Sequence, residues 1–436
     1  MEPRDELSLD QINLSDAAFW DRPFDVREGA FQRLRRESPL AFFEDPELDP
    51  TVALFIPKGD GYRAVTRHAD VLEVSRHPEI YSSAKGATSI QDMPVELLEY
   101  FGSMVNTDDP RHALLRRVVA RAFSPRTIKR IEDRIEEIAR SIIDRVAERG
   151  ECDFVLDVAA RLPLEMICDL MGVSSSDYQT VFDASNVIVN STNAAIGAGD
   201  PEYTPEGDLL TSLLVNAEML TGLVSELAEF RRNAPADDVT SALVNTNVDG
   251  EALTPAEIAS FFILLVVAGN DTARNTMSLG LHALTTHPAQ RAIWMADPMG
   301  VAPTGVEEMV RWCSPVVWMR RTVTSPTELA GVSLEPGEKV LLYYNSANRD
   351  EEAFRDPYAF DVRRSPNPHV GFGAAGPHFC LGAPLARTEI AVMFRQLFER
   401  LPDLVSVGEP DRLRSTFING VKHLTCAFTP VPVTSR

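Results

Sequence analysis

One cysteine of this chain stands in a sequence that suits metal chemistry. Cys380 lies in the stretch GFGAAGPHFCLGAPLAR, four residues after Gly376 and just before a helical pattern over residues 383–401. Backbone N–H groups and the amino end of a helix at such a junction stabilise a thiolate. Thiolates ligate metals, and haem iron accepts a single protein thiolate as an axial ligand. We therefore predict that Cys380 binds a metal.

The other four cysteines lack this setting, and we interpret them as small buried side chains: Cys152, Cys168, Cys313 and Cys426. Five cysteines are few and odd in number, and none forms a CxxC pair. This usage is typical of reduced thiols in a cytoplasm and argues against a disulfide framework or a zinc site.

The glycines before Cys380 also fit a different motif. Residues 371–376, GFGAAG, match the GxGxxG fingerprint of dinucleotide-binding proteins. That fingerprint needs a strand directly before it and a βαβ unit around it. The preceding residues 364–368, RSPNP, are rich in turn formers and unsuited to a central strand. We predict that the glycines serve another purpose.

An acid and a hydroxyl follow the most apolar stretch of the chain. Ala268-Gly269-Asn270-Asp271-Thr272 comes directly after FFILLVV. Two small residues let a flat cofactor approach a helix backbone, and a carboxylate in an apolar helix is costly unless it has a task. The alternative is that the Thr272 hydroxyl bonds the carbonyl of residue 268. Both interpretations stay open at this point.

Two pairs of polar residues lie one helical turn apart. His112 and Arg116 follow Asp109-Pro110, and this spacing suits an anionic partner such as a carboxylate. Glu308 and Arg311 have the spacing of an ordinary surface ion pair.

Helices must position most of these residues. Thr254-Pro255-Ala256-Glu257 is a capping box with proline at the first helical position, and His287-Pro288 discourages continuation. We expect a helix over about residues 255–286, which would span about 48 Å and be buried because its middle is apolar nearly all round. Helical spacing also covers residues 125–149, whereas residues 62–65 and parts of 316–345 (TVT, KVLLYYN) are strand-like. The fold class expected is mainly α with a small β-rich portion.

Charge and domain organisation limit the possible functions. Lys plus Arg is 42 and Asp plus Glu is 64, a formal charge of −22, which argues against a nucleic-acid binder. No stretch approaches the roughly 20 apolar residues of a membrane span, and the first ten residues do not resemble a signal peptide. We expect a flexible segment over residues 1–18 and a single domain over 19–436. Residues 193–208 would form either a mobile lid or a surface turn.

Taken together, these segments resemble the cytochrome P450 superfamily. The order DPRHALLR, AGNDT, EMVR, FRDPYAFDVRR and GFGAAGPHFCLG matches over nearly the whole chain from about Phe19. EIASFFILLVVAGNDTARN, SPVVWMRRTVT and YYNSANRDE further resemble an actinobacterial branch that hydroxylates terminal methyl groups of methyl-branched lipids and sterol side chains. One departure is that Phe372 stands eight residues before Cys380, where the superfamily's aromatic stands seven before it.

The resemblance implies a single haem-thiolate monooxygenase domain of the triangular, helix-rich P450 fold, with haem b as cofactor. Cys380 would ligate the iron, and Asp271 and Thr272 would deliver protons. Glu308, Arg311 and Arg364 would form a structural ion-pair cluster. The remaining residues implied to contact the cofactor are His112, Arg116, Arg321 and His378, which would pair with the propionates, and Ala268, Phe372 and Gly382.

An apolar pocket should lie above the cofactor. Leu264, Ala268 and Thr272 fall on one helical face, and Val267 neighbours them. Val316 and Val317 after Pro315, and Phe417 near the carboxyl terminus, would complete the wall. A wall of this kind suits a lipid chain. The alternative is that these are ordinary core residues.

The implied activity needs O2 and an external electron donor, since the chain contains no flavin segment. We expect a ferredoxin with its ferredoxin reductase, docking on Arg111, Arg117, Arg121 and Arg126, although these could also form a solvated helix face. The leading function is hydroxylation of a methyl-branched lipid or isoprenoid at a terminal methyl carbon, in the cytoplasm. The alternatives are a sterol side-chain hydroxylase, a peroxide-driven peroxygenase and a non-catalytic haem-thiolate sensor or lipid-binding protein.

Overall fold

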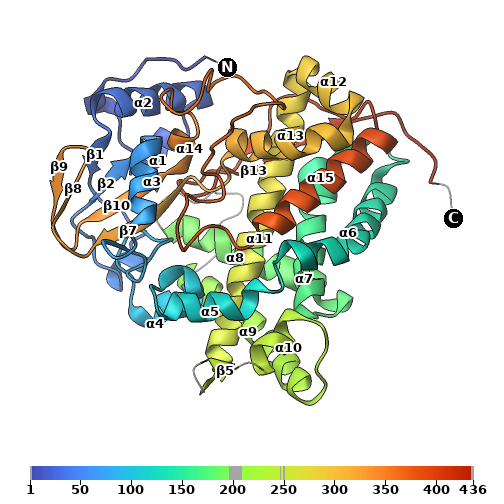
Figure 1. Cartoon of the computed structure of the whole chain (residues 1–436), viewed down its shortest axis with the longest axis horizontal. Helices are drawn as coiled ribbons and strands as arrows, with labels where there is room; N and C mark the ends of the chain where they lie inside the picture. The colour runs from blue at the N-terminus through green and yellow to red at the C-terminus, as the bar shows by residue number, and fades with distance from the viewer. Residues whose placement is uncertain (1, 196–208, 246, 249–250, 434–436) are drawn as a thin grey trace.

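One long helix forms the axis of the molecule. The computed structural model describes residues 2–195, 209–245, 247–248 and 251–433. Within them, α11 (Pro255–Thr286) runs through the centre, as Figure 1 shows in yellow. Its start is fixed by the predicted capping box, in which Thr254 accepts from the backbone N–H of Glu257 while the Glu257 side chain accepts from the backbone N–H of Thr254. The predicted bounds of this helix are confirmed.

Other helices surround α11, and strands and irregular segments join many of them. Those of the amino-terminal half are η1 (Leu9–Gln11), α1 (Ala17–Trp20), α2 (Phe24–Glu37), η2 (Val52–Leu54), α3 (His68–Arg76), α4 (Val95–Gly102), η3 (Ser103–Asn106), α5 (Arg111–Ala120), α6 (Pro125–Val146), η4 (Phe154–Ala159), α7 (Arg161–Met171), η5 (Ser175–Asp177) and α8 (Tyr178–Ala195). Those of the carboxyl-terminal half are α9 (Leu209–Asn233), α10 (Val239–Asn245), α12 (Pro288–Ala296), α13 (Pro298–Cys313), α14 (Tyr344–Ala347) and α15 (Ala383–Arg400).

A mixed five-stranded sheet lies on one side of the helical body, at the left of Figure 1. Its order is β1 (Leu40–Phe43), β2 (Tyr62–Val65), β10 (Lys339–Tyr343), β7 (Trp318–Val323) and β3 (Tyr81–Ser82), with only β2 and β10 parallel. A three-stranded sheet joins β11 (Val405–Ser406), β14 (Thr425–Ala427) and β4 (Glu151–Asp153). Two-stranded ribbons pair β5 (Asn247–Val248) with β6 (Glu251–Ala252), β8 (Thr327–Leu329) with β9 (Val332–Leu334), and β12 (Asp411–Arg412) with β13 (Val421–His423). The predicted class, mainly α with a small β portion, is confirmed.

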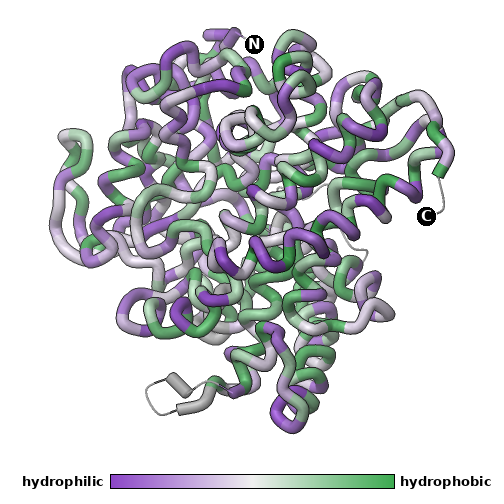
Figure 2. The backbone as a smooth tube through the Cα atoms, turned by 45° about the vertical axis from the view of Figure 1, so that its right-hand side comes forward, coloured by the Kyte–Doolittle hydropathy of each residue, from purple (hydrophilic) through white to green (hydrophobic). Residues whose placement is uncertain are grey.

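Two large apolar clusters include the two halves of α11. The amino-terminal half packs on α7, α8 and α9, and the carboxyl-terminal half packs on α13 and α15, in a cluster that also includes α6. Figure 2 shows hydrophobic segments concentrated toward the middle of the molecule. By length and composition α11 could cross a membrane, but 56% of its most apolar stretch is buried inside this fold. The helix is therefore a core element here.

Three expectations differ from the structure or fall outside it. The strand-like run KVLLYYN ends at Tyr343, because Tyr344 begins the short helix α14. Within the segment 1–18, Leu7, Ile12 and Leu14 are buried beside Phe31 of α2, which corrects the expectation that this segment is held loosely. Of the expected loop at 193–208, residues 193–195 end α8, and residues 196–208 lie outside the described residues.

Candidate active site

Cys380 lies where the glycine-rich loop joins α15, as the sequence predicts. Its backbone N–H donates to the Phe372 carbonyl at 2.9 Å, which folds the loop back on itself. Burial raises the pKa of the Cys380 thiol, whereas the backbone N–H groups of Gly382 and Ala383 and the Arg116 guanidinium lower it. These donors are the groups that would stabilise a metal-bound thiolate. The other four cysteines are buried free thiols.

The glycines of this loop serve close packing. A Cβ atom at Gly376 would stand 2.2 Å from the Ser75 carbonyl oxygen of α3, and one at Gly371 would stand 2.6 Å from Cγ1 of Val310 in α13. Gly373 has a positive φ of 82°. No strand directly precedes them in the described chain, since residues 364–370 form bends and irregular backbone. The prediction that GFGAAG is not a dinucleotide site is therefore confirmed.

Phe372 keeps its place beside the cysteine despite the extra residue between them. Its carbonyl accepts the Cys380 N–H, and the Arg387 guanidinium lies 4.5 Å from the centre of its ring. Its ring centroid is also 6.5 Å from that of Phe379. Phe372 is thus anchored between the cysteine loop and α15.

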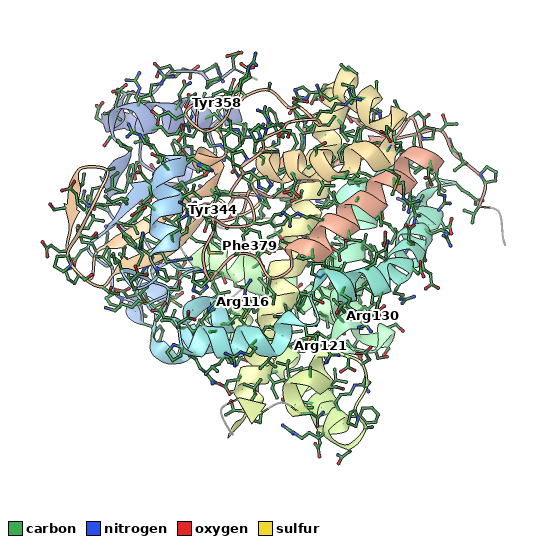
Figure 3. The ribbon with its side chains drawn as sticks, viewed as in Figure 1. Arg116, Arg121, Arg130, Tyr344, Tyr358 and Phe379 are labelled. Atoms are coloured by element: carbon green, nitrogen blue, oxygen red, sulfur yellow. The ribbon has the colours of Figure 1, made fainter. Side chains whose placement is uncertain are left out.

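Four nitrogen-bearing side chains from three parts of the chain meet beside this loop. His112 and Arg116 come from α5, Arg321 from β7, and His378 from the loop itself. The rings of His112 and His378 lie 4.2 Å apart, and Arg116 Nη2 donates to the Phe379 carbonyl at 2.7 Å. Figure 3 shows Arg116 and Phe379 on one face of the molecule, with Tyr344 on the other side of Phe379.

This group has a surplus of positive charge and donors. Burial, together with Arg321 and then His112, lowers the pKa of His378 to about 2. Burial also lowers the pKa of Arg321, whose Nη1 donates only to the neighbouring Arg320 carbonyl at 2.7 Å. Asp109 lies 3.2 Å from His112 Nδ1, and the charge of Asp108 also acts on His112 and Arg321. Such a cluster requires an anion, and carboxylates fit guanidinium and imidazole donors.

The face of α11 toward the loop is open. Ala268 is exposed in the middle of the helix, and Leu264, Val267 and Thr272 are only partly buried, whereas Phe262 is fully buried. An exposed alanine in the middle of a core helix indicates a space beside it that the protein's own side chains do not fill. Leu264, Ala268 and Thr272 therefore share one open face, as the helical spacing predicts.

Asp271 and Thr272 have distinct surroundings. Thr272 Oγ1 donates to the Ala268 carbonyl at 2.9 Å, so the simple backbone bond that the sequence left open does form. Asp271 Oδ1 pairs with Arg274 Nη2 at 2.6 Å, and its Oδ2 has no partner in the described structure. Burial raises the pKa of Asp271, and Arg274 lowers it. Sequence reasoning missed Arg274, although its place one turn after Asp271 is a visible signal.

The predicted wall residues are only partly brought together. Val316 is partly buried and bridges Ile418, and the Phe417 ring stands 4.9 Å from the Trp318 ring. Val317 is different, because its side chain is 2% exposed and packs in the cluster beneath α2. Neighbouring residues of an extended segment point to opposite sides, so Val316 and Val317 do not share a wall.

A buried ion-pair cluster supports the loop from behind. Glu308 and Arg311 are fully buried and form a two-pronged pair at 2.7 and 2.8 Å, which excludes the surface interpretation. Arg364 Nε joins Glu308 at 3.1 Å, as the resemblance implies. Arg311 and Arg364 also bond surrounding carbonyls, and this satisfies the buried donors.

A second cluster, which sequence reasoning missed, ties the cysteine loop to α15. Glu307 accepts from Arg387 Nη2 at 3.0 Å and contacts His369 Nε2 at 2.7 Å. Although burial raises the pKa of Glu307, its bonds with His369 and Arg387 lower it to about 2. Glu307 directly precedes the EMVR motif, which begins at Glu308, and sequence reasoning considered only the residues of the motif.

These features fit a flat metal cofactor with two carboxylate arms. The thiol of Cys380 could ligate a metal, and the exposed Ala268 leaves room for a flat face. The two guanidinium groups and two imidazoles beside the loop offer donors for carboxylates. Haem b has this set of properties, since it carries two propionates and accepts an axial thiolate.

The amino-acid sequence matches the cytochrome P450 family over residues 95–293 and 295–414. The chain belongs to the cytochrome P450 family. It is therefore a monooxygenase with haem b, iron protoporphyrin IX, as its cofactor.

This P450 is similar in sequence to known relatives over 90% or more of its length. It is 48% identical over 431 residues to the methyl-branched lipid omega-hydroxylase of Mycobacterium tuberculosis, covering 98% of this chain and 97% of that one. It is 39% identical over 396 residues to a steroid C26-monooxygenase of Rhodococcus jostii, covering 90% of this chain and 80% of that one. A Mycobacterium marinum cytochrome P450 solved in complex with pseudoionone has a TM-score of 0.89 and 40% identity, covering 98% of this chain and 100% of that one.

Proposed function

We propose that this P450 hydroxylates a terminal methyl carbon of a methyl-branched lipid or isoprenoid. The observation that carries the proposal is the 48% identity over 98% of the chain to a protein named methyl-branched lipid omega-hydroxylase. The open apolar face of α11 at Leu264, Val267 and Ala268 supports it, since burial of a lipid chain there contributes about 0.8 kcal/mol per CH₂.

The chain's own residues hold the cofactor in this proposal. Cys380 would hold the iron through its thiolate, and the N–H groups of Gly382 and Ala383 would limit how much negative charge stays on its sulfur. The side chains beside the loop would pair with the two propionates, whose negative charge would offset the positive charge there. These side chains are His112, Arg116, Arg321 and His378. Phe372 packs beside the loop. Thiolate-ligated haem supplies the chemistry that cleaves O2 and inserts one oxygen atom into an unactivated C–H bond.

Asp271 and Thr272 move protons into the pocket. The unpartnered Oδ2 of Asp271 can bond a water, and burial favours the protonated form of this carboxyl. The Thr272 hydroxyl has spare lone pairs after its bond to Ala268, so it can accept a water at the open face of α11. A proton then passes from Asp271 through that water toward Thr272 Oγ1.

Electrons come from a ferredoxin and its reductase in this proposal. Phe379, the residue before Cys380, is 37% exposed and brings the cysteine loop to the surface. Figure 3 shows Arg116, Arg121 and Arg130 on the same face as Phe379. Among the residues the structure describes, Arg117, Arg121, Arg126 and Arg130 are exposed and have no ion-pair partner, whereas Arg111 pairs with Glu257. An acidic ferredoxin matches this basic patch on an otherwise acidic protein.

We further propose that the enzyme acts in the cytoplasm. All five of its cysteines are free thiols, which suits a reducing compartment, and Cys380 must stay reduced to serve as a ligand.

A second candidate function is hydroxylation of a sterol side chain. Its support is the 39% identity over 90% of the chain to a steroid C26-monooxygenase. A sterol side chain also ends in branched methyl groups, so the same apolar face could receive it.

The test is product analysis with the purified holoenzyme, a ferredoxin, its reductase and NADPH. The substrates are a methyl-branched fatty acid, the straight-chain acid of equal carbon number, and a sterol with a branched side chain. We expect a terminal alcohol by mass spectrometry, with kcat/KM about tenfold higher for the branched acid than for the straight one. No oxidised product from any of them would contradict the proposal and favour a sensor, and turnover only with added peroxide would favour a peroxygenase.

A variant checks the proton path within the same experiment. Thr272→Ala should still bind haem and substrate, but should form less product per electron consumed because the pocket loses a water-binding hydroxyl. Thr272→Ser keeps the hydroxyl and should restore coupling. An equal product yield per electron in wild type and Thr272→Ala would rule out this role.

A further inference from the structure

Three arginines from separate parts of the chain gather on one phenyl ring, away from the cofactor. Phe24 of α2 has the guanidinium carbons of Arg27, Arg349 and Arg412 at 5.3, 5.2 and 5.5 Å from its ring centre. Arg27 lies on α2, Arg349 follows α14, and Arg412 lies on β12. Attraction to the ring is modest for each cation, and it does not remove the repulsion among the three.

The protein supplies little negative charge to this group, which we call the arginine cluster (Arg27, Arg349 and Arg412). Glu28 is 1% exposed, and its Oε2 stands 3.4 Å from Arg349 Nε without forming a hydrogen bond. Arg27 and Arg412 have no ion-pair partner among the described residues. Burial, and then the charges of Arg27 and Arg349, lower the pKa of Arg412 to about 10. Asp21 and Glu409, both exposed, offset part of this charge without an ion pair to the cluster, so a surplus of positive charge remains.

A cavity lies between the arginine cluster and the segment that joins β12 to β13. It has a volume of about 30 Å³ and is lined by Phe24, Arg27, Glu28, Asn345 and Arg412, among others. Beside or within it, buried polar atoms without a partner include Nε of Arg27, Nε and Nη1 of Arg349, and Oδ1 of Asn345. A water needs about 10–15 Å³ on the same measure, so this volume suits one ion of chloride size or two waters.

We propose that this cavity is a binding site for one small monovalent anion, chloride or a carboxylate as small as formate, held by Arg27 and Arg412, which line it, with the charge of Arg349 beside them. Unpaired buried guanidinium groups are costly, and their N–H donors bind anions well. One negative charge joins that of Glu28 and lowers the net positive charge of the cluster. A larger anion exceeds the space that the cavity offers.

The bound anion would hold the segment between β12 and β13 against α2. The same cavity is lined by Val317, Ile418 and Asn419, and the Phe417 carbonyl accepts the Val317 N–H at 2.8 Å. Arg412 Nη1 also donates to Asn419 Oδ1 at 3.3 Å. Binding there holds the segment between β12 and β13 against the helical body, so the fold gains stability from it.

The test is a chloride titration of the holoenzyme at constant ionic strength, with gluconate replacing chloride. We expect a saturable rise of Tm with chloride or formate and none with gluconate, which is too large to enter. Arg412→Gln and Arg27→Gln should weaken the apparent chloride affinity by about tenfold or more. Arg22→Gln is the matched control, because Arg22 is an exposed arginine of the same segment outside the cavity lining and should leave the titration unchanged.

A second measurement on the wild-type protein does not depend on the variants folding. Crystals soaked in bromide should show an anomalous peak among Arg27, Arg349 and Arg412. A cavity that contains only water would give no such peak and no saturable rise in Tm. The absence of both the peak and the rise in Tm would overturn the proposal. An equal chloride response in the variants Arg412→Gln, Arg27→Gln and Arg22→Gln would also overturn it.

Discussion

A single buried carboxyl behind the cysteine loop makes stability depend on pH. Glu389 lies on α15, is 2% exposed, and its Oε1 has no partner among the described residues. Burial raises the pKa of this carboxyl from 4.5 to about 8. The folded protein therefore keeps a proton that the unfolded chain releases between these two values.

Glu389→Gln should remove this dependence. Because the folded-state pKa lies above the unfolded one, the stability contributed by the protonated carboxyl is fully present below about pH 4.5 and is lost as pH rises through about 8, at up to about 1.4 kcal/mol per pH unit. Thermal unfolding from pH 5 to 9 should show the variant gaining on wild type as pH rises. Glu399→Gln, at the more exposed end of α15, is the control and should show no such trend. A difference between Glu389→Gln and wild type that does not change with pH would contradict this account of Glu389.

At the scale of elements, the cysteine loop is positioned by its close approach to α3. A methyl group at Gly376 would stand 2.2 Å from the Ser75 carbonyl oxygen, which is backbone and cannot turn aside. Gly376→Ala should therefore push the loop from α3 and lower the free energy of unfolding by about 1–3 kcal/mol. Denaturant unfolding of the holoenzyme measures this loss.

A glycine-to-alanine substitution within a helix provides the control for Gly376→Ala. Gly222 lies within α9, and a Cβ atom there would meet nothing within 4 Å. Gly222→Ala should stabilise the protein by up to about 1 kcal/mol, because alanine favours a helix interior over glycine. Equal effects of the two substitutions would show that the contact with Ser75 does not constrain the loop.

Local signals in the sequence were sufficient to predict several elements. The bounds of α11 follow from a capping box at one end and His287-Pro288 at the other, and β2 matches the predicted residues 62–65. The helix at α6 begins at Pro125 as expected and ends at Val146, three residues before the predicted end. Strand propensity failed at Tyr344, where the chain turns into α14 and its tertiary contacts override the apolar run.

The site could be predicted only as far as its residues carry a local pattern. Cys380, Thr272 and the pair His112 and Arg116 were visible from spacing. The structure brings His112 and Arg116 beside the cysteine loop and leaves the Thr272 side of α11 partly open. The contacts of Glu307 with His369 and Arg387 join residues far apart in the sequence. No spacing rule reveals such contacts, and this is also why Val317 was expected on the wrong side of its segment.

At the scale of the whole molecule, the fold brings α5, β7, α11 and the cysteine loop to one place. The chain has a formal charge of −22, yet arginines and histidines collect around Cys380 and on the face that covers it. This distribution is what a dianionic cofactor inside and an acidic electron donor outside would require. It links the interior of the site to its surface.

The most direct test of the whole account is the spectrum of the reduced carbon monoxide complex. Wild type and Cys152→Ser, which changes a buried thiol on β4, should both show the signature of thiolate ligation. Cys380→Ser should lose that signature, because a serine hydroxyl does not replace the sulfur as an electron-rich ligand. A thiolate spectrum that persists in Cys380→Ser, or a wild-type protein that stays colourless after reconstitution with hemin, would contradict the assignment of Cys380 as the iron ligand.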